Sequence, residues 1–131
     1  MDDPIWIEIA LAKAIHARQL AEHGGADGVR DEGLLTSALG RARHLFAYSD
    51  PTPDVQTLAA AYAYGIAKNH AFIDGNKRAA LVISLTFLAL NGHTLSATRE
   101  EVYNMFLGLA AGDVSEDEMG AWLTAHSARI A

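Results

Sequence analysis

Nine consecutive residues, His70-Ala71-Phe72-Ile73-Asp74-Gly75-Asn76-Lys77-Arg78, bring together the side-chain types that transfer of a phosphate-containing group requires. His70 can accept the proton of an attacking hydroxyl, because an imidazole commonly changes its charge between about pH 5 and pH 8. Asp74 can hold Mg²⁺, which usually binds few carboxylates together with phosphate oxygens of the substrate. Phosphoryl or nucleotidyl transfer needs a base, a hard cation and fixed positive charge, and this stretch supplies a residue for each role.

The charge of the residues that follow the loop indicates an anion site. Ala79 to Leu90 is the most apolar dozen of the sequence, so the loop must close onto the start of a buried helix, with Asn76 as a preferred N-cap type and Gly75 able to adopt positive φ. Lys77 and Arg78 then fall in the first turn, where the helix dipole disfavours a cation by about 0.3–1 kcal/mol. A bound phosphate removes this conflict, so we expect all four of these polar or glycine positions, 75 to 78, to bind nucleotide or phosphate.

The helices that position this loop are delimited by clear start and stop signals. Asp3-Pro4 predicts the start of a first helix, which Gly24-Gly25 ends. Asp31 predicts the N-cap of a second helix that runs to about Leu45. Thr52-Pro53-Asp54 opens a third helix, which continues into the histidine of the loop.

The third helix and the helix from about Lys77 to Leu90 are predicted to pack antiparallel, because the alanines between Ala59 and Ala67 permit a close approach. Asn91-Gly92 ends the apolar helix. We therefore predict an all-α bundle of about six helices, with a central buried helix and an active-site loop before it.

Two capping boxes, which begin at Thr98 and Ser115, predict the last two helices, and a short extended connection through Thr94 and Leu95 precedes them. The segment from Arg41 to Tyr48 is predicted to form an exposed flap beside the site, because prolines and polar residues follow it. Its two end residues are candidates for positioning a target peptide.

Composition limits the classes of function. The 131 residues carry a formal charge of −6, which argues against a broad basic surface for nucleic acid, and we expect one domain over residues 1–131. Cysteine is absent, which excludes disulfides and fits a cytoplasmic protein. The N-terminus is acidic and unlike a signal peptide. The apolar run of residues 79–90 spans about 18 Å as a helix, against roughly 30 Å of bilayer core, so no membrane span is expected.

The pattern His-x-Phe-x-Asp-Gly-Asn-Lys-Arg from His70 to Arg78 resembles the signature of the Fic/Doc superfamily, His-x-Phe-x-Asp/Glu-Gly-Asn-Gly/Lys-Arg. Lysine at position 77 is similar to the Doc (death-on-curing) branch. The Fic branch usually has another arginine three residues after Arg78, whereas this chain has Leu81. Further Doc-like landmarks follow in order along nearly the whole chain: Gly33-Leu34-Leu35-Thr36-Ser37-Ala38, Phe46-Ala47-Tyr48, Leu90-Asn91-Gly92-His93 and Trp122-Leu123.

The resemblance implies a Fic/Doc-like fold and one of two activities. Fic proteins typically transfer AMP from ATP to a hydroxyl of a target protein. Doc toxins act as protein kinases that bind the nucleotide in the reverse sense. The Doc resemblance implies ATP as substrate, Mg²⁺ as cofactor, His70 as catalytic residue and Asp74 as metal ligand, with a threonine of translation elongation factor Tu as target and blocked translation as the result.

Lysine at position 77 favours transfer of the γ-phosphoryl group. Glycine would let the backbone approach a phosphate, whereas lysine fills that space and adds a mobile charge, so the nucleotide pose should change. Fic-type transfer of AMP stays open as the alternative, and so does an inactive module that binds a nucleotide or a partner. A metal-dependent hydrolase is disfavoured, because His70 and Asp74 supply too few ligands.

The remaining histidines lack the spacing of a helical zinc site and are interpreted as structural or surface residues: His16, His23, His44, His93 and His126. Many Fic proteins carry an inhibitory helix of the form Ser/Thr-x-x-x-Glu-Gly/Asn, but the nearest string here, Ser96 to Glu100, is followed by Glu101. We therefore expect restraint in trans, by the small antitoxin of a type II toxin-antitoxin system, whose tail folds into a groove on this protein.

Overall fold

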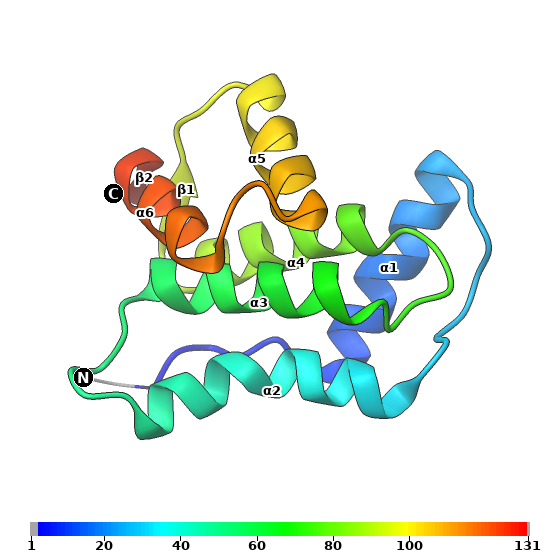
Figure 1. The fold of residues 1–131 in the computed structure, drawn as a ribbon, viewed down its shortest axis with the longest axis horizontal. Helices are drawn as coiled ribbons and strands as arrows, with labels where there is room; N and C mark the ends of the chain where they lie inside the picture. The colour runs from blue at the N-terminus through cyan, green and yellow to red at the C-terminus, as the bar shows by residue number, and fades with distance from the viewer. Residues whose placement is uncertain (1–2, 131) are drawn as a thin grey trace.

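Two helices of the computed structural model, α3 (Val55–Asn69) and α4 (Asn76–Leu90), run antiparallel through the middle of the molecule and are joined by residues 70–75, the motif loop (Figure 1). The structure describes residues 3–130. The other elements are α1 (Ile9–His23), α2 (Glu32–Tyr48), β1 (His93–Leu95), α5 (Arg99–Ala111), α6 (Glu116–His126) and β2 (Ser127–Arg129). The six helices in the described residues confirm the predicted all-α class.

The elements around the central pair leave the motif loop at one end of the bundle. α2 and α6 pack on α3, α1 packs on α4, and α5 contacts both central helices. β1 and β2 form one short antiparallel ladder, in which His93 lies opposite Arg129. Figure 1 shows that the motif loop lies at the same end as α1 and the connection from α1 to α2. None of the described helices is both long and apolar enough to cross a membrane.

Small side chains on several faces of α3 let its neighbouring helices approach closely. Ala59 to Ala63 includes four alanines, all of them buried. Gly65 lets α2 approach α3, because a Cβ at this position would lie 3.0 Å from the carbonyl oxygen of Ala38 on α2. Larger side chains fill the rest of the core, where the rings of Tyr62 and Phe87 lie 4.9 Å apart between centroids. The predicted antiparallel pairing of α3 and α4 is confirmed.

The predicted helix ends at short polar residues are also confirmed. Asp31 accepts a hydrogen bond from the Leu34 N–H, and Asp54 caps α3 in the same way. Thr98 and Ser115 each form a complete capping box, at the starts of α5 and α6. These ends could be predicted because each cap depends on residues only three positions apart.

The predicted start of the first helix is wrong. α1 begins at Ile9, and residues 3–8 before it are not helical. The Ile5 N–H donates to Asn91 Oδ1, and Asn91 Nδ2 donates to the Ile5 carbonyl, at 2.8 and 3.0 Å. Ile7 is buried in the core. These distant contacts outweigh the local signal of Asp3-Pro4, because they satisfy the backbone and bury an apolar side chain at once.

The predicted flap from Arg41 to Tyr48 is also wrong, because α2 continues as a helix to Tyr48. Phe46 packs edge-on against Trp6 at 5.6 Å between ring centroids, which stabilises this last turn of α2. The Arg41 guanidinium forms an ion pair with Glu116 of α6. The hydrogen bond to Glu116 raises the pKa of Arg41. Arg41 thus joins α2 to α6.

Stability should fall at alkaline pH because of Tyr62. The Ile7 N–H donates to its hydroxyl oxygen at 3.1 Å, and burial raises the pKa of this phenol above its ordinary value of 10.0. Above about pH 10 the unfolded chain therefore releases this proton before the folded chain does, which favours unfolding. Urea unfolding from about pH 8 to about pH 11, a range that spans the ordinary pKa of a phenol, should show a decline in the free energy of unfolding. Tyr62→Phe should make this decline with pH less steep. An equal slope in the variant would contradict this assignment.

Candidate active site

The motif loop begins with a strained residue. His70 follows the last residue of α3 and has left-handed backbone angles, φ 51° and ψ 45°. This conformation costs roughly 1–2 kcal/mol for an ordinary residue, although histidine adopts it more readily than most. Arg30 compensates, since its Nε donates to the His70 carbonyl at 2.8 Å and its Nη2 to the Asn69 carbonyl at 3.3 Å. A cation is also favourable at the C-terminal end of a helix.

The connection from α1 to α2 runs beside the motif loop as a second backbone. Val29 and Phe72 form an antiparallel bridge. The Ala71 carbonyl accepts from the two N–H groups that follow Val29, at 2.8 and 3.1 Å, and the Ile73 N–H donates to the Gly28 carbonyl at 3.1 Å. The loop backbone is therefore fixed on both sides of Phe72, whose ring is buried.

The helix start differs from the prediction. Gly75, with φ 77°, is the N-cap of α4, and Asn76 is the first helical residue instead of the cap. The Asn76 side chain bonds back to the loop, because Oδ1 accepts from the Phe72 N–H at 3.1 Å and Nδ2 donates to the Phe72 carbonyl at 3.0 Å. Two hydrogen bonds to the backbone of Phe72 satisfy both ends of this amide, whereas a capping bond would satisfy only its oxygen. Asn76 therefore shapes the loop, and no side chain caps α4.

Asp74 is held by backbone donors. Its Oδ1 accepts from the Gly75 N–H at 2.8 Å, and its Oδ2 accepts from the Ala26 N–H at 3.3 Å. An ionised carboxylate offers about four lone pairs, so each oxygen keeps capacity for a further partner. Residues 3–130 contain no group of three or more His, Asp or Glu side chains placed to hold a metal. The donor set therefore fits only a cation such as Mg²⁺ that takes most of its ligands from phosphate and water.

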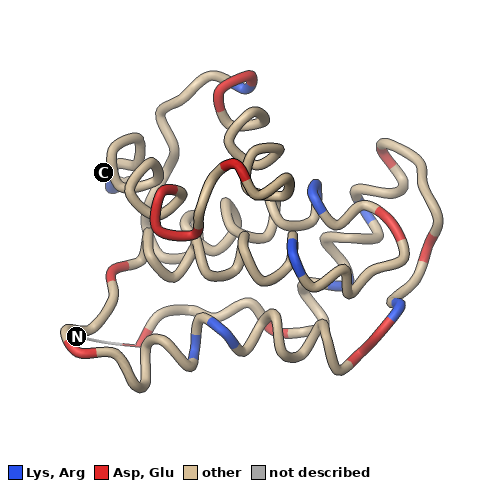
Figure 2. Tube along the Cα trace, viewed as in Figure 1, with Lys and Arg blue, Asp and Glu red and all other residues tan. Residues whose placement is uncertain are grey.

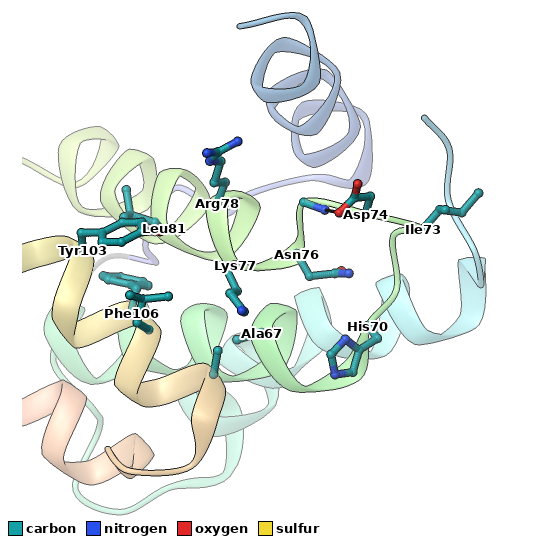
Figure 3. Close-up of a pocket in the computed structure, with 13 residues that line it drawn as sticks. Ala67, His70, Ile73, Asp74, Asn76, Lys77, Arg78, Leu81, Tyr103 and Phe106 are labelled. Atoms are coloured by element: carbon teal, nitrogen blue, oxygen red, sulfur yellow. Dashed lines mark hydrogen bonds between the residues drawn. The ribbon is translucent and has the colours of Figure 1, made fainter. Parts of the chain in front are cut away.

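A cavity of about 430 Å³ lies beside the loop and extends from α3 and α4 to α5. Figure 3 shows His70 and Asn76 at one end, Lys77 pointing into the space between the helices, and Arg78 pointing away from Lys77. The predicted site residues all line this cavity: His70, Asp74, Gly75, Asn76, Lys77 and Arg78. The loop thus brings the predicted set together, although Asp74 faces the connection between α1 and α2 and Arg78 diverges from Lys77.

The positive charge at the start of α4 has no protein partner within the described chain. Lys77 and Arg78 are exposed, and neither side chain takes part in an ion pair or hydrogen bond with residues 3–130. The backbone N–H groups of residues 76–78 also lack acceptors there. Figure 2 shows basic and acidic positions interspersed along the visible chain, so this is a local site on a mixed surface. A helix start with free donors and two cations suits a phosphate.

The far end of the cavity is apolar and was missed by sequence reasoning. Leu81, Tyr103 and Phe106 form this wall with Leu107 and Ala110. Tyr103 is 50% exposed, although it is a large aromatic residue of α5. The sequence signal that could have indicated this wall is Tyr103 itself, an aromatic residue on the polar face of a predicted helix. Arg30 was missed as well, and its contact with the loop has no local sequence pattern.

The family follows from a comparison of the sequence with known protein families. The model of the Fic/DOC family matches residues 6–88, more than half of the chain, and the protein belongs to that family.

Two named relatives lie on the Doc side of the family. The chain is 33% identical over 102 residues to "Protein kinase doc" of Escherichia phage P1, which covers 78% of this chain and 79% of that protein. It is 36% identical over 107 residues to "Toxin Doc" of Mycolicibacterium smegmatis, covering 80% and 82% respectively. The predicted resemblance to the Doc branch is thereby confirmed.

Proposed function

We propose that this protein is a Doc-like toxin, a transferase that moves the γ-phosphoryl group of ATP to a serine or threonine hydroxyl of a target protein. Family membership and the two Doc relatives support a transferase of the toxin type. One relative is named as a protein kinase, which supports the choice of phosphoryl transfer. The observation that carries this choice is the distribution of polar and apolar groups along the cavity.

The apolar and polar groups along the cavity favour one orientation of a bound nucleotide. Tyr103 and Phe106 offer an apolar surface for a base at one end, Lys77 lies between, and His70 lies at the other end (Figure 3). A base stacked at the α5 end directs the triphosphate past Lys77 and the start of α4. The terminal phosphate then lies nearest His70. Leu81 adds to this apolar end, at the position where the Fic pattern has an arginine.

The proposed reaction assigns a role to each residue of the loop. His70 takes the proton of the target hydroxyl while its oxygen bonds to the γ-phosphorus, and the bond from that phosphorus to the oxygen of the ADP leaving group breaks. Asp74 would hold Mg²⁺, whose charge offsets that of the phosphates. Gly75 leaves room for phosphate oxygens to approach the backbone, and the N–H groups after it can donate to them. Lys77 and Arg78 supply the fixed positive charge.

The transferred group can be identified with two labels. Purified protein is incubated with a candidate target, Mg²⁺, and ATP labelled at either the γ- or the α-phosphorus. Label from the γ-position alone is expected on the target, and mass spectrometry should find added phosphate on a serine or threonine. Target label from the α-phosphorus would overturn phosphoryl transfer in favour of Fic-type AMP transfer. Growth arrest that persists without any target label would favour a binding module.

The target and the restraint are part of the same proposal. A threonine of translation elongation factor Tu is the first target to test, in a bacterial extract whose translation should stop when the protein and ATP are added. An antitoxin acting in trans is proposed because the chain needs restraint when it is expressed. Expression alone should arrest bacterial growth, and harmless high-level expression of the intact protein would contradict the toxin assignment.

A further inference from the structure

His16, on α1, lies against the motif loop although it is far from it in sequence. The residue is 3% exposed, and its Nε2 lies 2.7 Å from the carbonyl oxygen of Asp74. The imidazole stacks on Phe72, with 3.8 Å between ring centroids and 8° between planes. The hydrogen bond and the ring contact both join His16 of α1 to the motif loop.

The chemistry of the contact assigns the proton. A carbonyl oxygen can only accept, so the Nε2 of His16 must donate. The acceptor belongs to the peptide unit between Asp74 and Gly75, whose N–H in turn donates to Asp74 Oδ1 at 2.8 Å. Because a peptide unit is planar, the direction of its carbonyl also sets the direction of its N–H. His16 therefore acts on the Asp74 carboxylate through one rigid plane.

The second contact limits movement of the same peptide unit. Gly75 has positive φ, and a Cβ at this position would lie 3.6 Å from His16 Nε2, so the ring also occupies the space beside the turn. Gly75 can rotate more freely than any other residue type. Without the His16 donor, the peptide unit has an unsatisfied carbonyl next to this flexible residue.

We propose that His16 is a positioning residue, which fixes the peptide unit between Asp74 and Gly75 and so fixes the directions of the Asp74 carboxylate and of the N-cap of α4, the two groups that the proposed reaction uses for the cation and the phosphates. The effect on turnover rests on the proposed phosphoryl transfer. The effect on the loop does not depend on it. The other titratable side chain at this contact is Asp74 itself, whose carboxylate bonds to the N–H groups of Gly75 and Ala26.

Two variants separate the hydrogen bond from the packing. His16→Phe keeps a flat ring on Phe72 but has no donor, and His16→Gln keeps a donor near the position of Nε2 but has no ring. We expect the Phe variant to lower kcat by roughly 10- to 100-fold, as misplacement of a reacting group does, and to need more Mg²⁺ for half-maximal rate. The Gln variant should recover most of both. Equal damage in the two variants, or none in the Phe variant, would overturn the proposal.

Two measurements judge the loop without any transfer. In the native protein, ¹⁵N NMR should find the His16 proton on Nε2, and a proton found only on Nδ1 would overturn the proposal even if the variants did not fold. Amide hydrogen exchange at Gly75, whose N–H donates to Asp74 Oδ1, should be faster in the Phe variant than in the native protein when no nucleotide is present. If the native protein transfers nothing, the proposed function fails, while these two measurements still decide the role of His16.

Discussion

Replacing His70 by asparagine should reduce transfer to the target by about 10²–10⁴-fold, because asparagine cannot take the hydroxyl proton. Asparagine is the suitable replacement here. It tolerates the left-handed backbone that His70 adopts, and the Arg30 hydrogen bonds go to backbone carbonyls that remain in place. Initial rates with γ-labelled ATP measure the loss, and the thermal midpoint should stay within a few degrees of the native value, as for a change below about 1 kcal/mol.

His44→Asn is a matched control, because His44 is an exposed histidine of α2 outside the cavity. Its transfer rate should equal that of the native protein. Growth arrest in cells should be lost with His70→Asn and retained with His44→Asn. A His70→Asn protein that folds and still phosphorylates its target at the native rate would remove His70 from the chemistry.

Replacing both Lys77 and Arg78 by glutamine should change activity and stability in opposite directions. Nucleotide binding should weaken by about 10-fold or more, since each charge-assisted hydrogen bond to phosphate is worth about 1.5–3 kcal/mol. The nucleotide-free protein should become more stable by roughly 0.3–1 kcal/mol per cation removed, because both cations oppose the dipole of α4. Calorimetric titration with an ATP analogue and urea unfolding without nucleotide measure the two effects.

Arg99→Gln offers the control for the dipole effect. Arg99 is the first residue of α5, so it is also a cation at a helix start, but it lies outside the cavity. This variant should gain a little stability and bind nucleotide as the native protein does. If the double variant at positions 77 and 78 lost stability instead, the two cations would have a structural partner and the anion site would lose its support.

The parts of the fold that could be predicted are those set by near neighbours in sequence. The caps at Asp31, Asp54, Thr98 and Ser115 each depend on an N–H only three residues away. The parts that could not be predicted depend on distant segments. Asp3-Pro4 is a good local helix start, but Asn91, far along the chain, binds the backbone of Ile5 and keeps it out of a helix.

The candidate site also has a part that the sequence predicts and a part that depends on distant segments. The loop residues could be predicted as a set because they are contiguous, and their types limit the chemistry. Their directions could not be predicted, because Arg30 and His16 come from other elements and no spacing links them to the loop. Tyr103 joined the cavity only through the packing of α5 on the central helices. Residue type alone predicts Asn76 as a cap, whereas its two hydrogen bonds to Phe72 depend on the shape of the loop.

The backbone pairing of Val29 with Phe72, and the Arg30 hydrogen bond to a carbonyl 40 residues later, make catalytic competence a property of the complete fold. Such distant contacts form only after the entropy of closing the intervening chain has been overcome, when α2 and α3 have already docked. Under the proposed function, an unfolded chain that contains the whole motif is therefore expected to transfer no phosphate, because its loop is not yet fixed. Under the proposed function, the antitoxin would then bind the folded protein, in which the motif loop already has its final shape.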